Sequence, residues 1–543
     1  MTNNLISVTL QQSGTEVPDN RYLWKQEIIG NIHLHNSATT KTPSSTFCAR
    51  SIDTTRTRTQ WTSFDSQASS TPFTSLNEKR CIVREYLSLY NNIITIGTYF
   101  GPSQLTTVTA IKALKRCIIQ HPALSTTIRY QPTEKFELVR PAKVDISQHL
   151  QIVDDIGQGN AFLQNILDRL HNDPIVEDDS IPQWKAVVVR LETGFHLAFS
   201  CSHGLADGRS GQAFHATFLE TLQNLSSYDQ DIDEDTILPT TKQWNPPPPM
   251  ERLGNLTISW KFLLGPLANE YFPKAVTRFL GLAEEKVEDL WLGAKEKPAL
   301  PEEGELLATG VRVASVPADV LELVLVSARM HDAKLTGLVS FLIARALARS
   351  LQKRGQAYSS FLAPLPIDLR RALGKGQGQI ANYVSNIVEM ISIPSTRISD
   401  QDLSDSEWLQ VRNTTARLLT ASGTLADQPV GLLKYLMNFR EYTLKKAKAP
   451  ATESFEVSNV GLFDGTGAAE DASPQWRVDQ MLFSQSANAG GPPLNFNLAS
   501  AKGGDLTITA TWWRQMLGVR DEDAFVQEVC DALVEDMNHL GSC

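Results

Sequence analysis

The sequence predicts a mixed α/β protein of two lobes, and three features support this fold class. The chain has 543 residues, which exceeds the size at which a single core stops growing, so two domains of roughly 200 residues are expected. β-branched runs alternate with segments of helical period in both halves. An acidic stretch followed by four prolines, within residues 226–250, separates the halves as a linker. Two lobes of related construction are a natural setting for a site between them.

Residues 1–75 are expected to form an extension rather than a domain. Half of the 40 residues in 36–75 are Ser or Thr, 20 in all, which leaves too few apolar side chains for a core. The globular pattern begins at residue 76. A β-branched run at 93–99 predicts a strand, and the spacing of apolar residues over 105–124 predicts a helix.

The N-terminal lobe, residues 76–225, ends in a predicted hairpin followed by a helix. Alternating apolar residues give strands over 185–191 and 195–202, joined by a turn at 192–194. The sequence "CSHGLADGRSG" (201–211) follows, and Phe214, Phe218 and Leu222 then recur at helical spacing. His203 is therefore predicted to lie in a loop between a strand and a helix.

The C-terminal lobe, residues 251–543, opens with a mildly amphipathic section (251–298) that fits either an interfacial helix or a packed excursion of this lobe. The patterns then predict helices over 318–332, 335–351 and 522–540. They predict strands over 310–316, 384–392, 455–461, 493–500 and 505–513. The second half thus repeats the mixed character of the first.

Composition excludes several classes of protein. No apolar run approaches the roughly 20 residues that span a bilayer, and the net charge of −10 argues against a general nucleic-acid binder. The six cysteines form no CxxC pair, which disfavours a zinc site and a disulfide framework, and the N-terminus lacks a secretory or transit signal. We expect a cytoplasmic protein without metal, and association with a lipid surface stays open.

His203 is the candidate catalytic residue. A histidine at a strand exit can act as a general base, because its pKa lies near neutrality and a bend can fix its tautomer. A lone histidine there is more often a loop residue, but Gly204, Gly208 and Gly211 permit tight turning and Asp207 can fold back or cap the next helix. The chain has no GxSxG and no HExxH, which leaves serine-hydrolase and zinc-protease chemistry unsupported.

"HGLADG" at 203–208 resembles the HxxxDG motif of the CoA-dependent acyltransferase superfamily, which includes BAHD, chloramphenicol acetyltransferase and condensation-domain proteins. The likeness is strongest to the fungal alcohol O-acetyltransferase family. It extends over roughly residues 76–540 and is carried, in order, by "HPALSTTI", "PQWK", "HGLADGRSGQAFH", "DLWLG", "LTGLVSFL", "PIDLRR", "NYVSN", "VSNVG" and "FNLAS".

The resemblance implies two lobes like those of chloramphenicol acetyltransferase, with a tunnel between them that admits acyl-CoA from one side and an alcohol from the other. It implies that His203 is the base and that Asp207 points away and pairs with Arg370, with Arg371 and Arg312 as alternatives. Gly208 completes the structural part of the motif. Candidate oxyanion or substrate contacts are Ser484, Ser486 and Asn459.

The expected activity is transfer of an acyl group, most simply acetyl from acetyl-CoA, to the alcohol of a small molecule by a monomeric enzyme. No covalent acyl-enzyme is expected, since Cys201 beside the motif has the character of a buried packing residue. A thioesterase, or a non-catalytic binding protein on the same scaffold, are the alternatives. The sequence does not specify the acceptor or the length of the acyl chain.

Overall fold

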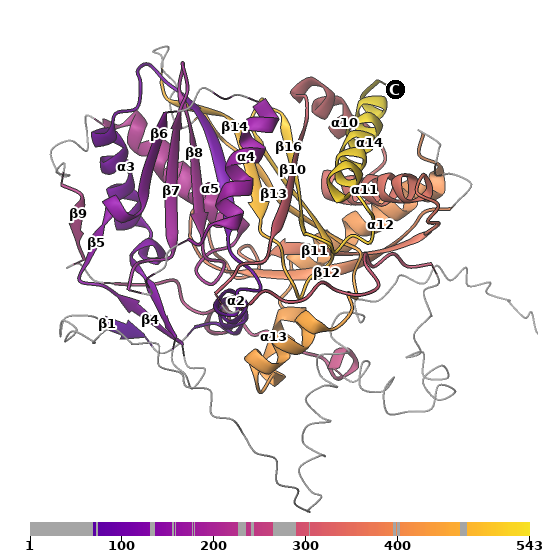
Figure 1. Ribbon diagram of the computed structural model, residues 1–543, viewed down its shortest axis with the longest axis horizontal. Helices are drawn as coiled ribbons and strands as arrows, with labels where there is room; N and C mark the ends of the chain where they lie inside the picture. The colour runs from indigo at the N-terminus through magenta and orange to yellow at the C-terminus, as the bar shows by residue number, and fades with distance from the viewer. Residues whose placement is uncertain are drawn as a thin grey trace, which may run out of the picture.

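The structure is a computed structural model of the chain (Figure 1). It describes residues 69–71, 74–130, 136–154, 157, 159–175, 178, 180–225, 235–240, 244–263, 289–302, 304–394, 398, 402–466 and 475–542. Most of the predicted extension and much of the amphipathic section at 251–298 therefore lie outside the described residues. No helix in the described ranges has the length and apolar character needed to cross a membrane.

The first lobe is built on a five-stranded sheet with the order β14-β2-β8-β7-β6. Opposite faces of its strands pack on different helices: α3 and α5 contact one face, and α4 covers the other and reaches β10 of the second lobe. The predicted hairpin is present, with antiparallel pairing from Trp184 to Arg190. The elements are α3 (Thr107–Gln120), α4 (Gly159–Asn172), α5 (Gly208–Gln223), β2 (Ile93–Phe100), β6 (Leu150–Asp154), β7 (Trp184–Arg190), β8 (Phe195–Cys201) and β14 (Arg477–Gln485).

The second lobe contains a four-stranded sheet, β10-β16-β15-β13, and a two-stranded ribbon, β11-β12. Helix α11 is buried along almost its whole length between these strands and neighbouring helices, which explains its apolar sequence. The elements are β10 (Thr309–Val316), β11 (Ser360–Asp368), β12 (Val384–Ser392), β13 (Phe455–Phe463), β15 (Leu494–Ala501), β16 (Leu506–Trp513), α10 (Ala318–Met330), α11 (Leu335–Gln352), α12 (Asp405–Ser422) and α14 (Glu522–Ser542).

Strand β14 joins the two lobes and corrects the sequence-based division at residue 250. It follows most of the second lobe in sequence, yet it pairs antiparallel with β2 at the edge of the first lobe's sheet. The hydroxyls of Thr507 and Thr509, on β16, donate to the carbonyls of Met481 and Phe483 at 2.7 Å each. A division in sequence cannot reproduce this arrangement, because the partners of β14 lie in both halves of the chain.

Short paired segments modify the expected extension and linker. Ser69–Thr71 forms β1 against β4, and Ile237–Pro239 forms β9 against β5, so parts of both stretches belong to small sheets. Each is too short for a local signal, since the partner strand supplies its hydrogen bonds. The remaining elements are α2 (Leu76–Tyr86), α7 (Met250–Leu253), α13 (Phe439–Lys448), β3 (Thr127–Tyr130), β4 (Phe136–Arg140), β5 (Lys143–Asp145) and 3₁₀ turns at Pro122–Ser125, Ile146–Gln148 and Pro429–Tyr435.

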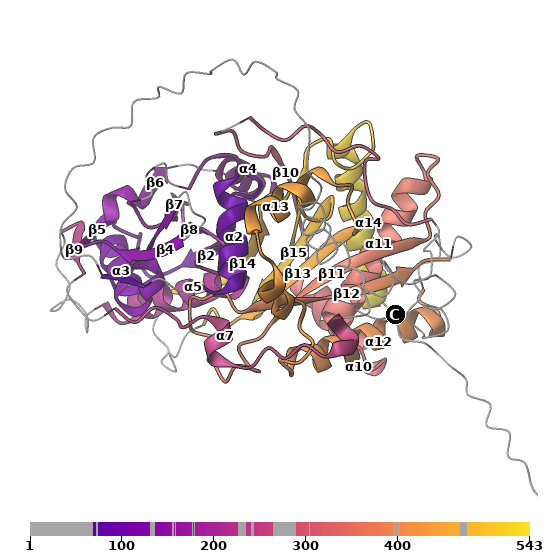
Figure 2. The same ribbon diagram turned by 90° about the horizontal axis from the view of Figure 1, so that it is seen from below.

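Helices α2 and α13 lie at the junction of the lobes, where both views place them next to each other (Figure 2). Ser75 begins α2 with a capping box: its side chain accepts from the backbone N–H of Glu78, whose carboxylate accepts from the N–H of Ser75. Through this placement, residues of α2 reach the loop that carries His203.

Candidate active site

The loop between β8 and α5 holds the motif in a fixed shape. Asp207 is the N-cap of α5, and its carboxylate accepts from the backbone N–H of Ser210 at 3.1 Å. The Ser210 hydroxyl in turn accepts from the N–H of Asp207, which completes a capping box. The helix therefore begins directly after the motif.

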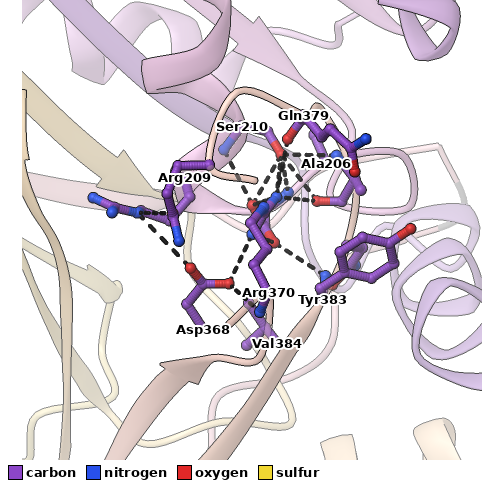
Figure 3. A network of polar contacts seen from close by, with 12 residues as sticks. Ala206, Arg209, Ser210, Asp368, Arg370, Gln379, Tyr383 and Val384 are labelled. Carbon is purple, nitrogen blue, oxygen red and sulfur yellow. Dashed lines mark hydrogen bonds and ion pairs between the residues drawn. The ribbon is translucent and has the colours of Figure 1, made fainter. Parts of the chain in front are cut away.

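Asp207 forms a bidentate ion pair with Arg370, which lies at the centre of the polar network in Figure 3. The Nη1–Oδ2 and Nη2–Oδ1 distances are 2.7 and 2.9 Å, and both side chains are fully buried. Burial opposes ionisation of Asp207, but Arg370 and the N–H of Tyr383 outweigh it and hold the pKa of this carboxyl below its usual value. Arg370 also donates to the carbonyls of Gln379 and Ala381.

The two alternative arginines are placed elsewhere. Arg312, on β10, pairs with Asp523 at 3.2 Å, and Arg371 is exposed in the turn after β11. The contact implied by the resemblance is thus made by Arg370. It ties the motif of the first lobe to a loop of the second.

The imidazole of His203 is oriented by a backbone carbonyl. Nδ1 lies 2.9 Å from the oxygen of Ala206, and since a carbonyl can only accept, Nδ1 carries the proton in this contact. In the neutral ring Nε2 is then the acceptor. Asn382 donates to the carbonyl of His203 at 2.6 Å and holds the backbone of the loop.

Glu85, on α2, holds the same loop from the opposite side. Its carboxylate accepts from the N–H of His203 at 2.6 Å and of Gly204 at 3.3 Å, and from the Ser202 hydroxyl. Burial raises the pKa of Glu85 to about 7, against the hydrogen bond from Ser202, which lowers it. Glu85 and Asn382 were not singled out from the sequence, because nothing local marks the residues that reach a loop from far along the chain.

His203 faces a cavity of about 1300 Å³, its open mouth included, which is lined by both lobes. Its walls carry hydroxyl, amide and charged groups together with apolar ones, contributed by α2, α13 and five strands. The lining includes Arg80, Arg84, Tyr90, His203, Gly208, Pro364, Asn386, Tyr442, Lys446, Glu453, Glu456, Ser458, Phe483, Gln485, Ser486 and Asn495.

Gly208 is required by close packing at this cavity. A Cβ atom on it would lie 2.6 Å from Cγ1 of Val460 and 2.8 Å from Cζ of Phe483. The glycine therefore lets the first turn of α5 approach the second lobe.

The three predicted oxyanion or substrate contacts fall in different surroundings. Ser486 lines the cavity, and its hydroxyl accepts from the N–H groups of Asn91 and Asn92. Ser484 is buried with its hydroxyl 2.7 Å from Nε2 of His171. Asn459 donates to the Thr336 hydroxyl at 3.1 Å. Ser484 and Asn459 are not among the lining residues, so of the three Ser486 alone meets the cavity.

Two further features bear on the chemistry. Cys201 is buried in β8, and burial raises the pKa of its thiol, which is typical of an unreactive packing cysteine. Within the described ranges, no three or more His, Cys, Asp or Glu side chains are grouped so that they could hold a metal ion.

Comparison with known proteins finds relatives of the chain. No family model matches the sequence. The chain is 23% identical over 380 residues to a probable alcohol acetyltransferase, crmB, of Aspergillus fumigatus, covering 68% of this chain and 75% of that protein. It is 21% identical over 441 residues to a probable alcohol acetyltransferase, FCK4, of Fusarium pseudograminearum, covering 76% and 84%. The chain is therefore similar to fungal alcohol acetyltransferases over about two thirds or more of its length.

Solved structures of acyltransferases share the fold. The trichothecene 15-O-acetyltransferase TRI3 of Fusarium sporotrichioides superimposes with a TM-score of 0.61 at 14% identity, covering 88% of this chain and 97% of that one. The first condensation domain of the calcium-dependent antibiotic synthetase gives 0.54 at 13% identity, with 87% and 97% covered. The two-lobed acyltransferase fold predicted from the sequence is confirmed, and the protein is an acyltransferase.

Proposed function

We propose that the protein transfers an acyl group, most simply acetyl from acetyl-CoA, to the hydroxyl of a small molecule, with His203 as the general base. The observation that carries this proposal is the contact of Nδ1 with the Ala206 carbonyl, at a cavity lined by both lobes. That contact leaves Nε2 as the acceptor that a base needs. The named relatives support an alcohol as acceptor.

The proposed reaction needs no group beyond His203 to move the proton. Nε2 takes the proton of the hydroxyl while the oxygen attacks the thioester carbonyl. When the tetrahedral intermediate collapses, the C–O bond stays and the C–S bond breaks, and the imidazolium returns its proton to the departing CoA thiolate. The oxyanion requires donors, and Ser486 is the predicted candidate that lines the cavity.

The walls of the cavity indicate the kind of acceptor. Arg84, Lys446, Glu453 and Glu456 place charges of both signs around it, and Asn386 adds an amide. Charged and amide groups on the wall of a site are complemented better by the polar groups of a ligand than by hydrocarbon, which would displace their hydrating water. We propose an acceptor with further polar groups, and an enzyme that acts as a cytoplasmic monomer.

Mass spectrometry of products tests the proposal. The full chain is incubated with acetyl-CoA and a pooled library of polar and apolar alcohols, and with longer acyl-CoAs in parallel, and His203→Ala serves as the matched control. We expect an ester to form with the wild-type chain, at a rate that depends on the acceptor. Release of CoA without ester, at a rate independent of acceptor, would identify a thioesterase instead. Binding of CoA without turnover would identify a binding protein.

A further inference from the structure

A cluster of polar side chains beside His203 is not used by the mechanism above. Its centre is the sulfur of Cys81, on α2, which is fully buried. Nη2 of Arg84, one turn later, donates to this sulfur at 3.2 Å, and Nδ2 of Asn382 lies 3.6 Å from it. Nδ2 of Asn382 also lies 3.3 Å from Nδ1 of His203, so the imidazole is a direct neighbour of this cluster. Two donors therefore converge on one sulfur beside the imidazole.

Arg84 supplies the positive charge of this cluster. Its guanidinium stacks over the ring of Tyr90 at 4.8 Å, and its Nε is buried without a hydrogen-bond partner. It forms no ion pair with a carboxylate in the part of the chain that the structure describes, so its one charge-assisted contact is to Cys81. Arg84 is half-buried at the wall of the cavity, and its positive charge would stabilise a thiolate at Cys81.

The other titratable groups around His203 do not provide the anion. Glu85 is engaged by the loop N–H groups and Ser202, and burial raises its pKa to about 7. Glu456, on β13, accepts from Gln485 at 2.9 Å, and burial raises its pKa as well. Tyr90 has its pKa raised by burial. Asp207 is committed to Arg370.

The pKa of Cys81 is shifted in the opposite direction, toward the charged form. Burial alone would raise the pKa of Cys81, but the charges of His203 and Arg84 more than offset it and lower the pKa well below its usual value. For His203, burial disfavours the protonated ring, whereas Cys81 favours it, and the pKa of the imidazole is raised overall. The two shifts agree with the convergence of donors on the sulfur.

We propose that Cys81 is the positioning residue of His203: its thiolate, held by Arg84, stabilises the imidazolium that forms when His203 takes the acceptor's proton. This inference rests on the proposed function. In serine-protease triads a carboxylate has this role. Here the carboxylate of the motif is turned to Arg370, and a thiolate on a neighbouring helix takes its place. Cys81 is not among the residues that line the cavity, so it acts through His203 and not on substrate.

Replacing Cys81 should move the pH profile, which a merely structural role would not do. The base works when deprotonated, so kcat/KM rises with pH through the pKa of His203. In Cys81→Ala and Cys81→Ser the anion is lost, the pKa of His203 falls, and the rise should occur at lower pH. The plateau of kcat should drop about tenfold to a hundredfold, a fraction of what a general base contributes. Cys117→Ser, which changes another fully buried helical thiol, should leave both unchanged.

The decisive experiment requires no turnover. The ultraviolet absorbance of thiolate is titrated in the wild-type chain, Cys81→Ser and Cys117→Ser, and the imidazole of His203 is titrated by NMR in the same samples. We expect a wild-type thiolate that titrates below the usual thiol value of about 8.5, is lost in Cys81→Ser and is kept in Cys117→Ser. We also expect a lower pKa of His203 in Cys81→Ser.

A difference between wild type and Cys81→Ser that titrates at or above the usual thiol value, or an unchanged pKa of His203, would overturn the inference. If the Cys81 variants fail to fold, the titration is made on a chain with Cys48→Ser and Cys543→Ser and decides alone, since the pKa values of Cys117, Cys201 and Cys530 are raised by burial. Absence of a thiolate below the usual value would then refute it. Lack of ester in the product assay, with the titration as expected, would refute the proposed function and leave the pairing intact.

Discussion

The two ends of the motif differ in how completely their polar groups are paired. At Asp207 both carboxylate oxygens accept from Arg370, and the N–H groups of Ser210 and Tyr383 add to them, all without contact with solvent. At His203 the backbone is fixed by Glu85, but the ring has an acceptor nitrogen facing a cavity with charged walls. The carboxylate of Asp207 is fully paired, whereas the imidazole of His203 keeps one nitrogen that can accept a hydrogen bond from a ligand.

This difference indicates that Asp207 has a structural role and His203 a chemical one, although both lie in the same six-residue motif. A carboxylate whose oxygens already accept all their hydrogen bonds has none left for substrate, and its ion pair stabilises the interface between the lobes. A general base must keep one acceptor atom without a hydrogen-bond partner until the substrate binds. We infer that the acid of the motif holds the loop and that the histidine performs the reaction.

The largest effect is expected from removing the reactive end. His203→Ala should lower kcat by about 10²–10⁴-fold, the usual contribution of a general base, because the variant lacks the imidazole that takes the proton. The melting temperature should change little, since the loop is held by backbone contacts to Glu85 and Asn382. Ester formation and thermal melting are measured together. Turnover near the wild-type level would show that His203 is not the base.

Substitutions at Asp207 and Arg370 should instead lower the free energy of unfolding. Arg370→Ala should cost about 3–5 kcal/mol, because buried Asp207 loses its only cationic partner among the described residues. Asp207→Ala should cost somewhat less, because Arg370 keeps its ion pair with Asp368 at 3.0 Å. The double variant should cost much less than the sum. A double-mutant cycle by urea unfolding measures this coupling, with Arg312→Ala, which breaks a partly exposed pair, expected to cost about 0–1 kcal/mol. Additive losses at 207 and 370 would contradict the pairing.

The same pair has a predicted dependence on pH. Because Arg370 and the loop N–H groups lower the pKa of Asp207, the ionised pair contributes its full stability above the ordinary aspartate value, about 3.9. That contribution is lost as the pH falls through the lower pKa of the folded state. Acid unfolding of wild type and Asp207→Ala should therefore converge at low pH; a constant difference would contradict the account.

Gly208→Ala should have a smaller effect. The added methyl meets Val460 and Phe483 at distances that force one of them to shift, and overpacking of this kind costs about 1–3 kcal/mol. Gly376→Ala, in a loop with open space around it, is the matched control. Equal melting temperatures for the two variants would show that the lobes are not closely packed at this point.

The smallest expected effect concerns Glu85, which holds the loop that carries His203. Its pKa is raised from 4.5 to about 7, so the folded chain binds an extra proton between these values and its contribution to stability falls as the pH rises through that window. Glu85→Gln removes the titration, so the stability of the variant relative to wild type should increase from pH 4.5 to about 7. Urea unfolding at several pH values measures it. Parallel curves would argue against a buried, titrating carboxyl.

Sequence patterns anticipated what is local. The strand of residues 384–392 coincides with β12, and the hairpin before His203 and helix α11 follow from period alone. The pairing of Asp207 with Arg370 was expected only through the family resemblance, since 163 residues separate the two. Glu85, Cys81 and Asn382 could not be predicted from the sequence either, because they too lie far along the chain from the residues that they contact. No strand was predicted over Arg477–Gln485, because the hydrogen bonds of β14 are set by tertiary contact with β2.

The most direct test of the division of roles is Asp207→Asn, with kcat and melting temperature measured on the same preparation. Asparagine keeps a side-chain oxygen for the helix cap and removes the charge opposite Arg370. We predict a clearly lower melting temperature, with kcat within about tenfold of wild type at temperatures where the variant is folded, because the carboxylate does not contact His203. A variant that melts like the wild type but has lost about 10⁴-fold in kcat, the signature of a misplaced imidazole proton, would contradict the account.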